Sequence, residues 1–355
     1  MLSRPYGDTW VRSVGCREVN RVRIKSIRRA TSDEWDRVWQ ACGYATYFHS
    51  REWAEIIRAY TDGHTQPEPV SVIFSDGKTA LLPLSAGLAA SGRRDYVSSP
   101  CGTYGGWISE SSLGADHAVL LHDLLTSEQI VWRLNPYDTV AQTALAGLGE
   151  PDETQALRLC DGFESIYRHW SYDHKKAERQ ARRNGVQVRM AAGIEDWRAY
   201  YGVYQDCLRR WADGATSSYG WELFDQIRRL SSPWVALWLA TYDGAVVSGI
   251  LAFHTKSHVV AWHGATFEHC FHLRPANLIY SEFIRDSCER GYLWADLNPS
   301  GGHEGVKVFK QRFGATPLPC AVIRTEPRTP ELVGRIAEFK RRVKRRVLPW
   351  VHWLR

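Results

Sequence analysis

The sequence contains one pattern of structural elements twice, about 165 residues apart, and this repeat limits the folds open to the chain. Residues 22–27 and 186–191 alternate apolar and polar side chains, which is the pattern of a half-buried strand. Two helical patterns follow each of them, and then two apolar runs joined by an Asp-Gly pair that begins at Asp76 or at Asp243. Asp-Gly between apolar strands indicates a hairpin, because glycine tolerates the positive φ of a tight turn. Four matches in the same order predict a duplicated domain.

Each copy continues with a fourth strand, a helix and a final strand. These segments are expected at residues 96–99, 116–125 and 130–135 in the first copy, and at 258–263, 276–290 and 292–297 in the second. The order strand–helix–helix–strand–strand–strand–helix–strand therefore occurs twice and predicts a mixed α/β fold. The expected division is a first domain at 20–160, a connecting helix at 161–184, a second domain at 185–328 and a basic amphipathic tail at 329–355.

The net charge of +6 is concentrated near the end of the sequence. Residues 335–346 contain seven basic residues and one acidic residue, so the rest of the chain sums to about zero. Such a segment attracts polyanions. Because apolar residues are interleaved with the basic ones, three interpretations stay open: contact with tRNA, peripheral contact with an anionic membrane, or a helix packed on the second domain.

Cysteine usage and the first residues predict a cytoplasmic protein. The eight cysteines are irregularly spaced and form no CxxC pair, which favours free thiols over disulfides or a structural zinc site. Residues 1–30 include Asp8 and Glu18 and no continuous apolar run, so no signal peptide is expected. Two histidine pairs have ligand-like spacing but no accompanying carboxylates, and we expect no metal and no cofactor. They are His254/His258 and His269/His272.

Several motifs give the chain a resemblance to a known family. These are FHSREW at 48–53, YGG at 104–106, KKAERQARRNGV at 175–186, and Asp296 followed by GVKVFKQRFG at 305–314. With the repeated element order, they resemble the FemABX group, in which two GNAT acyltransferase units are joined by a basic helix. The second half also resembles the BioF2-like acetyltransferase domain. The resemblance implies two tandem GNAT-like domains and an amide-forming enzyme of peptidoglycan or natural-product biosynthesis.

Lys310 is the first candidate for a catalytic residue. Phe309 and Phe313 are four residues apart and are expected to share a buried helix face, with Lys310 beside it. In the FemABX group the lysine of this motif lies near the acyl ester, where a fixed ammonium stabilises negative charge on the carbonyl oxygen. Asp296 is expected either to orient the loop after its strand or to act as base for the attacking amine, and His303 is a second candidate base. For Lys310, Asp296 and His303 alike, the alternative interpretation is a purely structural role.

The connecting helix carries a basic stripe suited to phosphates. One helix face carries Lys175, Arg179, Arg182 and Arg183. A nucleotide-linked acceptor or tRNA would supply the phosphates. In the FemABX group an arginine of this helix holds the acceptor's diphosphate, and Lys175 occupies that place without arginine's two-pronged fork. A solvated helix face is the alternative. The candidate substrate-binding residues are Tyr104, Gly105, Lys175, Arg179, Trp53 and Phe309.

The sequence also bears on the acyl donor. GNAT enzymes that use acyl-CoA hold its pyrophosphate in a glycine-rich loop at a helix start, and the equivalent residues 272–277 contain no glycine. This favours aminoacyl-tRNA as the donor. We expect an aminoacyltransferase that joins an amino acid to a primary amine of a small-molecule or cell-wall precursor acceptor. The alternatives are an acyl-CoA-dependent N-acyltransferase acting on an amino sugar or similar amine, and a catalytically inactive duplicate that binds RNA or a membrane.

Overall fold

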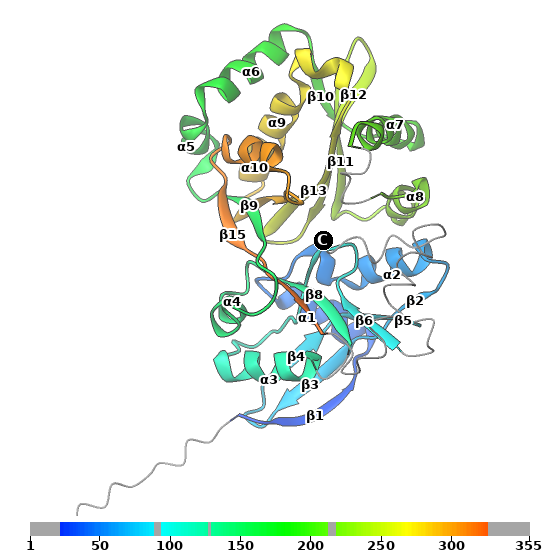
Figure 1. Ribbon diagram of the computed structural model, residues 1–355, viewed down its shortest axis with the longest axis vertical. Helices are drawn as coiled ribbons and strands as arrows, with labels where there is room; N and C mark the ends of the chain where they lie inside the picture. Colours follow the sequence, from blue (N-terminus) through cyan, green and yellow to red (C-terminus); the bar gives the residue numbers. More distant parts are fainter. Residues whose placement is uncertain (1–21, 89–93, 127–128, 212–217, 326–355) are drawn as a thin grey trace, which may run out of the picture.

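The computed structural model describes residues 22–88, 94–126, 129–211 and 218–325 (Figure 1). The predicted tail at 329–355 lies outside the described residues. Within the described part, no helix combines the length and the apolar character needed to cross a bilayer. The described cysteines are free thiols, as predicted.

The first half of the chain follows the predicted order and adds several short strands. Polar side chains fix where its first two long helices begin. The Oγ1 atom of Thr31 accepts a hydrogen bond from the N–H of Glu34 (3.2 Å), and Ser50 Oγ accepts one from the N–H of Trp53 (3.1 Å). The elements are β1 (Ile24–Arg29), α1 (Ser32–Ala41), η1 (Tyr47–His49), α2 (Arg51–Tyr60), β2 (Thr65–Pro67), β3 (Val70–Phe74), β4 (Thr79–Leu82), β5 (Leu84–Leu88), β6 (Arg94–Ser98), β7 (Tyr104–Gly105), α3 (Ala115–Thr126), β8 (Ile130–Leu134) and α4 (Thr139–Ala144).

The second half repeats the order and contains the second predicted hairpin. Tyr242 pairs with Ala245, and the two residues between them, Asp243 and Gly244, have φ of 50° and 77°. Two positive φ values define the type I′ turn that Asp-Gly favours. The elements are β9 (Glu153–Arg158), α5 (Gly162–His169), α6 (Tyr172–Arg183), β10 (Gln187–Met190), α7 (Ile194–Trp211), α8 (Trp221–Leu230), β11 (Val235–Tyr242), β12 (Ala245–His254), β13 (His258–Thr266), η3 (Glu268–Leu273), α9 (Pro275–Glu289), β14 (Trp294–Pro299), α10 (Glu304–Gln311), β15 (Thr316–Pro319) and β16 (Val322–Arg324).

The connecting segment at 161–184 is two helices, α5 and α6, where the sequence predicted one. Trp170 ends α5 with an extended ψ of 149°. Ser171 then begins α6, because its Oγ accepts a hydrogen bond from the N–H of His174 (3.2 Å). Serine is a preferred N-cap, and here that preference starts a new helix after an extended residue.

The two halves carry the same central strand pair. In the first half β6 lies parallel to β8, with Tyr96 opposite Ile130, in a sheet of order β16-β8-β6-β5-β2. In the second half β13 lies parallel to β14, with His258 opposite Trp294, in a sheet of order β10-β11-β12-β13-β14-β9-β15. A smaller sheet, β1-β3-β4, completes the first half. The predicted duplication and the mixed α/β fold are confirmed.

Two strands cross between the halves (Figure 1). β9 falls in the range 20–160 predicted for the first domain, yet it pairs with β14 and β15 in the second sheet. β16 follows the whole second unit and pairs with β8 in the first sheet. The domain boundaries given above stay a proposal. The pairing of β9 and β16 shows that strands are exchanged at both ends of the second unit.

A shared aromatic core joins the halves. The ring of Tyr47 stacks on that of Phe253 with centroids 4.8 Å apart, and Trp53 meets Trp262 edge-on at 5.6 Å. These four side chains belong to one buried cluster, which brings α2 of the first half against α8 of the second. Burial of each such ring contributes roughly 1.5–3 kcal/mol, so the two units are held together by a hydrophobic core.

Candidate active site

Asp296 on β14 is the centre of a buried hydrogen-bond network that spans both halves. Its Oδ2 accepts hydrogen bonds from the hydroxyls of Tyr104 and Tyr137, both at 2.8 Å. Its Oδ1 accepts the hydroxyl of Thr154 (2.5 Å) and the N–H of Asn298 (2.7 Å). The carboxyl group has no exposed surface. Burial raises the pKa of Asp296, and these hydrogen bonds oppose the shift.

All four partners of Asp296 donate, and a carboxylate has about four positions for accepting hydrogen bonds. Burial, followed by the charge of Asp296, raises the pKa of Tyr104 and of Tyr137 and so keeps both hydroxyls protonated. No position remains to take a proton from an attacking amine. Of the two roles expected for Asp296, this geometry fits the orientation of the loop after β14.

Lys310 on α10 holds the same loop from its other side. The side chain is buried, and Nζ donates to the backbone oxygens of Asn298 (2.7 Å) and Pro299 (3.2 Å) and to Ser300 Oγ (3.2 Å). An ammonium has three donors, so each has an acceptor here. Burial lowers the pKa of Lys310 to about 8, while the charge of Asp296 opposes the shift. The structure thus brings Lys310 and Asp296 together at one loop.

Two further predicted residues, Phe309 and His303, lie on α10 and directly before it. Phe309 is half-buried, and its backbone oxygen lies 3.0 Å from Nε2 of His174 on α6. Phe313, which follows α10, is fully buried. His303 precedes α10, and its ring stacks on that of Trp211 with centroids 6.2 Å apart. His303 therefore lies near the loop, but it faces the end of α7.

Trp53 and Gly105 are placed in the interior. Trp53 has no exposed surface and packs in the shared aromatic core, so in this conformation it contacts protein and no solvent. A Cβ atom added to Gly105 would lie 2.2 Å from the backbone oxygen of Ser98. Glycine is therefore required at 105 because β7 passes close to β6.

We expect Gly105→Ala to destabilise the protein by about 1–3 kcal/mol, since the methyl group meets backbone atoms that have little room to move. Urea unfolding followed by circular dichroism measures the change. The control is Gly202→Ala in α7, where nothing lies within 4 Å of the added Cβ and alanine favours the helix. Equal unfolding midpoints for wild type and Gly105→Ala would contradict the packing argument.

Lys175 and Arg179 are not brought to the loop. Lys175 Nζ donates to the backbone oxygen of Arg168 on α5 (2.8 Å), and Arg179 Nε donates to the backbone oxygen of Lys175 (3.2 Å). Both residues lie on α6, at the outer edge of the second half in Figure 1. Their roles in substrate binding stay a prediction.

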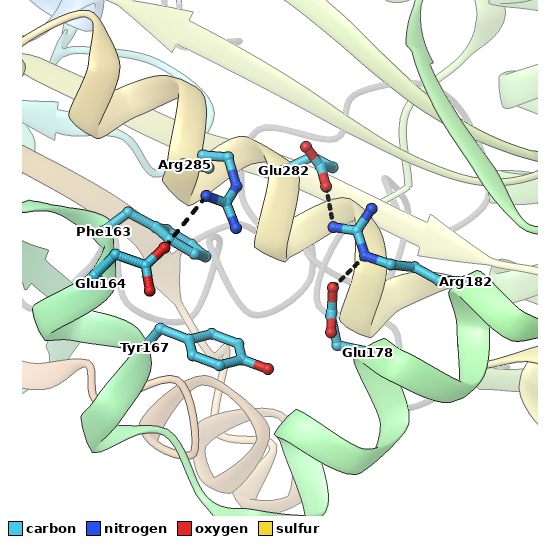
Figure 2. Close-up of a pocket in the computed structure, with 7 residues that line it drawn as sticks. All are labelled: Phe163, Glu164, Tyr167, Glu178, Arg182, Glu282 and Arg285. Carbon is cyan, nitrogen blue, oxygen red and sulfur yellow. Dashed lines mark hydrogen bonds and ion pairs between the residues drawn. The ribbon is translucent and has the colours of Figure 1, made fainter.

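A surface pocket of about 520 Å³ lies between α5, α6 and α9 (Figure 2). Its charged side chains pair with one another. Arg182 contacts both Glu178 and Glu282, and Arg285 lies 3.5 Å from Glu164. The complete lining is Phe163, Glu164, Tyr167, Glu178, Arg182, Glu282 and Arg285. Since the pocket contains neither Asp296 nor Lys310, we take the loop between those two residues as the candidate active site.

Sequence reasoning missed Tyr137 and Thr154 as partners of Asp296. A signal for Tyr137 was present: Leu-Asn-Pro ends the last strand of each copy, at 134–136 and at 297–299. Tyr137 directly follows the first Leu-Asn-Pro, as Ser300 follows the second. Thr154 had no such signal, because only the strand exchange brings β9 beside β14. Among the described residues, no three His, Cys, Asp or Glu side chains converge to hold a metal ion.

A family model matches part of the second half of the chain. Residues 168–311 match the model described as Acetyltransferase (GNAT) domain. This match identifies an acyltransferase domain in the second half, and the repeated strand pair gives the chain two GNAT-like units. No match is found among curated proteins.

Solved structures specify the arrangement further. The chain is similar to FemX, with a TM-score of 0.66 and 12% identity over 88% of this chain and 100% of that chain. It is also similar to a conserved protein of unknown function from Bacteroides thetaiotaomicron, with a TM-score of 0.52 and 10% identity over 84% and 99% of the two chains. A third is the C-terminal domain of a protein proposed to be a lysylphosphatidylglycerol synthetase from Agrobacterium fabrum, with a TM-score of 0.51 and 12% identity over 82% and 96%. The protein has the tandem GNAT fold of the FemABX type, as its motifs predicted.

Proposed function

We propose that the protein is a FemABX-like aminoacyltransferase. It transfers an amino acid from aminoacyl-tRNA to a primary amine of a small-molecule or cell-wall precursor acceptor, and it works in the cytoplasm, where aminoacyl-tRNA is found. The observation that carries this proposal is the environment of Lys310. A buried ammonium, held by three acceptors at the end of the parallel strand pair, is a fixed positive charge in a GNAT unit.

In the proposed reaction the acceptor amine attacks the ester carbonyl directly. A C–N bond forms, the C–O bond to the tRNA ribose breaks, and the ribose hydroxyl leaves with a proton from the amine. Lys310 stabilises the oxyanion when the carbonyl oxygen replaces Ser300 Oγ, one of its two acceptors at 3.2 Å. Asp296 and Asn298 keep the loop in place during this exchange.

The start of α9 supports tRNA over coenzyme A as the donor. A pyrophosphate at a helix start is bound by free backbone N–H groups. Here Pro275 has no N–H, and the N–H of Asn277 donates to the backbone oxygen of Arg274 (3.2 Å). Of the first three residues of α9, two therefore offer no free N–H group to a phosphate.

Acyl-CoA-dependent N-acylation of an amino sugar or similar amine is the competing function, since the matched family model describes an acetyltransferase domain. Calorimetric titration with coenzyme A and acetyl-CoA separates the two. We expect no saturable binding. Saturable binding of coenzyme A or acetyl-CoA at micromolar concentration would show that the donor is acyl-CoA and not aminoacyl-tRNA.

Lys310→Ala is expected to lower the rate of transfer by about 10²–10³, the usual loss when one oxyanion donor is removed. The assay uses purified tRNA charged with a mixture of amino acids and detects the amide product by mass spectrometry. Lys307→Ala is the matched control, because Lys307 lies on the same helix and pairs with Glu153 at the surface (2.7 Å). A Lys310→Ala enzyme with full turnover would remove Lys310 from the mechanism.

A pH profile separates a catalytic Lys310 from a merely structural one. The fraction of neutral acceptor amine rises tenfold per pH unit up to its pKa of about 10. Above about pH 8 the charged fraction of Lys310 falls at the same rate. We therefore expect kcat/KM of the wild type to rise below pH 8 and to level off above it. The residual activity of Lys310→Ala should keep rising past pH 8, and parallel profiles would assign the lysine a structural role alone.

A further inference from the structure

Large rings are exposed where α7 ends, beside the loop after β14. Trp211 is 37% exposed and Phe271 on η3 is 44% exposed. The guanidinium of Arg210 lies near both rings, 5.9 Å from the Trp211 ring centre and 4.9 Å from that of Phe271. The ring of His303 stacks on Trp211 with an interplanar angle of 19°. We call these four residues the stacking platform.

The stacking platform lies next to the candidate active site. The N–H of His303 donates to the backbone oxygen of Ser300 (3.0 Å), which closes a turn whose ends are within about 7 Å. Ser300 Oγ is in turn an acceptor of Lys310. η3 follows β13 and residues 300–303 follow β14, so the platform lies at the ends of the parallel strand pair.

A basic helix face begins on the other side of η3. Lys176, Arg179 and Arg183 are exposed on α6 at positions i, i+3 and i+7, which places them on one face. Gln180, at the edge of that face, donates from Nε2 to the backbone oxygen of His272 (3.3 Å), the residue after Phe271. Positive side chains and exposed rings therefore follow one another along the surface towards the loop that the buried Lys310 holds.

We propose that the stacking platform binds the unpaired bases at the 3′ end of the donor tRNA, and that the basic face of α6 binds phosphates of the same strand. This inference rests on the proposed function. Bases of an unpaired strand stack on aromatic and guanidinium planes, and a neighbouring basic surface follows the backbone. The amino acid is esterified to the terminal ribose, so a terminal base stacked on the exposed ring of Trp211 or Phe271 places the ester beside Ser300 and Lys310.

The test measures binding separately from chemistry. The probe is a fluorescently labelled single-stranded RNA that ends in CCA and carries no amino acid, and its affinity is followed by anisotropy at fixed salt. We expect Trp211→Ala and Phe271→Ala each to weaken binding by roughly 5- to 150-fold, the loss associated with one stacked base. Tyr242→Ala is the matched control, because Tyr242 is 40% exposed on β11 outside the platform. Arg179→Ala should reduce the salt dependence of binding while the effect of Trp211→Ala persists.

Two results would overturn the proposal, and they differ. If the wild type binds the RNA and both ring variants bind it equally well, the platform assignment is wrong and tRNA remains the donor. If the wild type binds no RNA but binds coenzyme A, and Trp211→Ala weakens that binding, the platform holds the adenine of coenzyme A and the proposed donor is wrong. Melting curves of the variants confirm that the surface changes leave the fold intact.

Discussion

Asp296→Ala is expected to lower the free energy of unfolding by about 3–5 kcal/mol. This is the range, about 3–5 kcal/mol, seen when one partner of a buried charged pair is removed and the other is left without its partner. Alanine leaves the hydroxyls of Tyr104, Tyr137 and Thr154 and the N–H of Asn298 without their acceptor in the interior. Each unsatisfied donor costs roughly 1–3 kcal/mol. Two of these donors belong to the first half, so the variant also weakens the junction between the units.

Urea unfolding measures the effect, and two further variants identify its cause. Asp296→Asn keeps the shape and lets the hydroxyls rotate to accept from the amide, so its loss should be smaller than that of alanine. Asp123→Ala is the control, because that side chain is 68% exposed. Superimposable curves for wild type and Asp296→Ala would show that the network contributes nothing to stability.

The second large effect expected is loss of stability in acid. Burial is the first cause that lowers the pKa of five histidines: to about 4 for His49, His174, His254 and His258, and to about 3 for His263. The ordinary pKa of histidine is near 6.5, so at pH 5 the unfolded chain holds these protons and the folded protein does not. Stability is therefore fully present above pH 6.5 and is lost as the pH falls towards 4.

Each of these histidines contributes roughly 2 kcal/mol to the loss between pH 7 and pH 5, at 1.36 kcal/mol per pKa unit. The raised pKa of Asp296 acts in the opposite direction, because the folded state binds that proton more tightly. We expect the melting temperature to fall steeply below pH 6.5. Calorimetry in buffers of different ionisation enthalpy should show a net uptake of about four protons on unfolding at pH 5.

His254→Gln removes one of the five titrating groups and should reduce the proton uptake by about one. His169→Gln, at an exposed position, is the control. A melting temperature that stays constant from pH 7 to pH 5 would mean that the buried imidazoles are protonated in the folded state.

The duplicated fold could be predicted from the sequence because each copy carries local signals. Asp243-Gly244 fixes a hairpin through the φ values of two adjacent residues, and Ser50 fixes the start of α2 through one side chain. The break at Ser171 has the same local origin, but the continuous helical pattern around it concealed the cap.

The candidate site was predictable only in part. The motif 305–314 identified Lys310, and the end of a strand identified Asp296. Their partners depend on contacts between residues far apart in the chain: Tyr104 and Asp296 are 192 positions apart. Burial could not be predicted either, because the local sequence around a Trp or a Tyr is the same whether the side chain is buried in a core or lines a cleft. Trp53, which was predicted to bind substrate, is in the core, while Trp211, which was not predicted, is 37% exposed.

The exchange of β9 and β16 has a consequence for how the protein is made. The first sheet gains its edge strand only when residues 322–324 pair with β8, after almost all the described chain has been synthesised. Until then β8 lacks that neighbour, and an unpaired strand edge is a template for wrong association. The first unit therefore cannot finish folding while the ribosome is still producing the second, and a shortened chain that stops before β16 leaves the first unit with an open edge. Although the sequence contains two similar units, the two units complete their folding together.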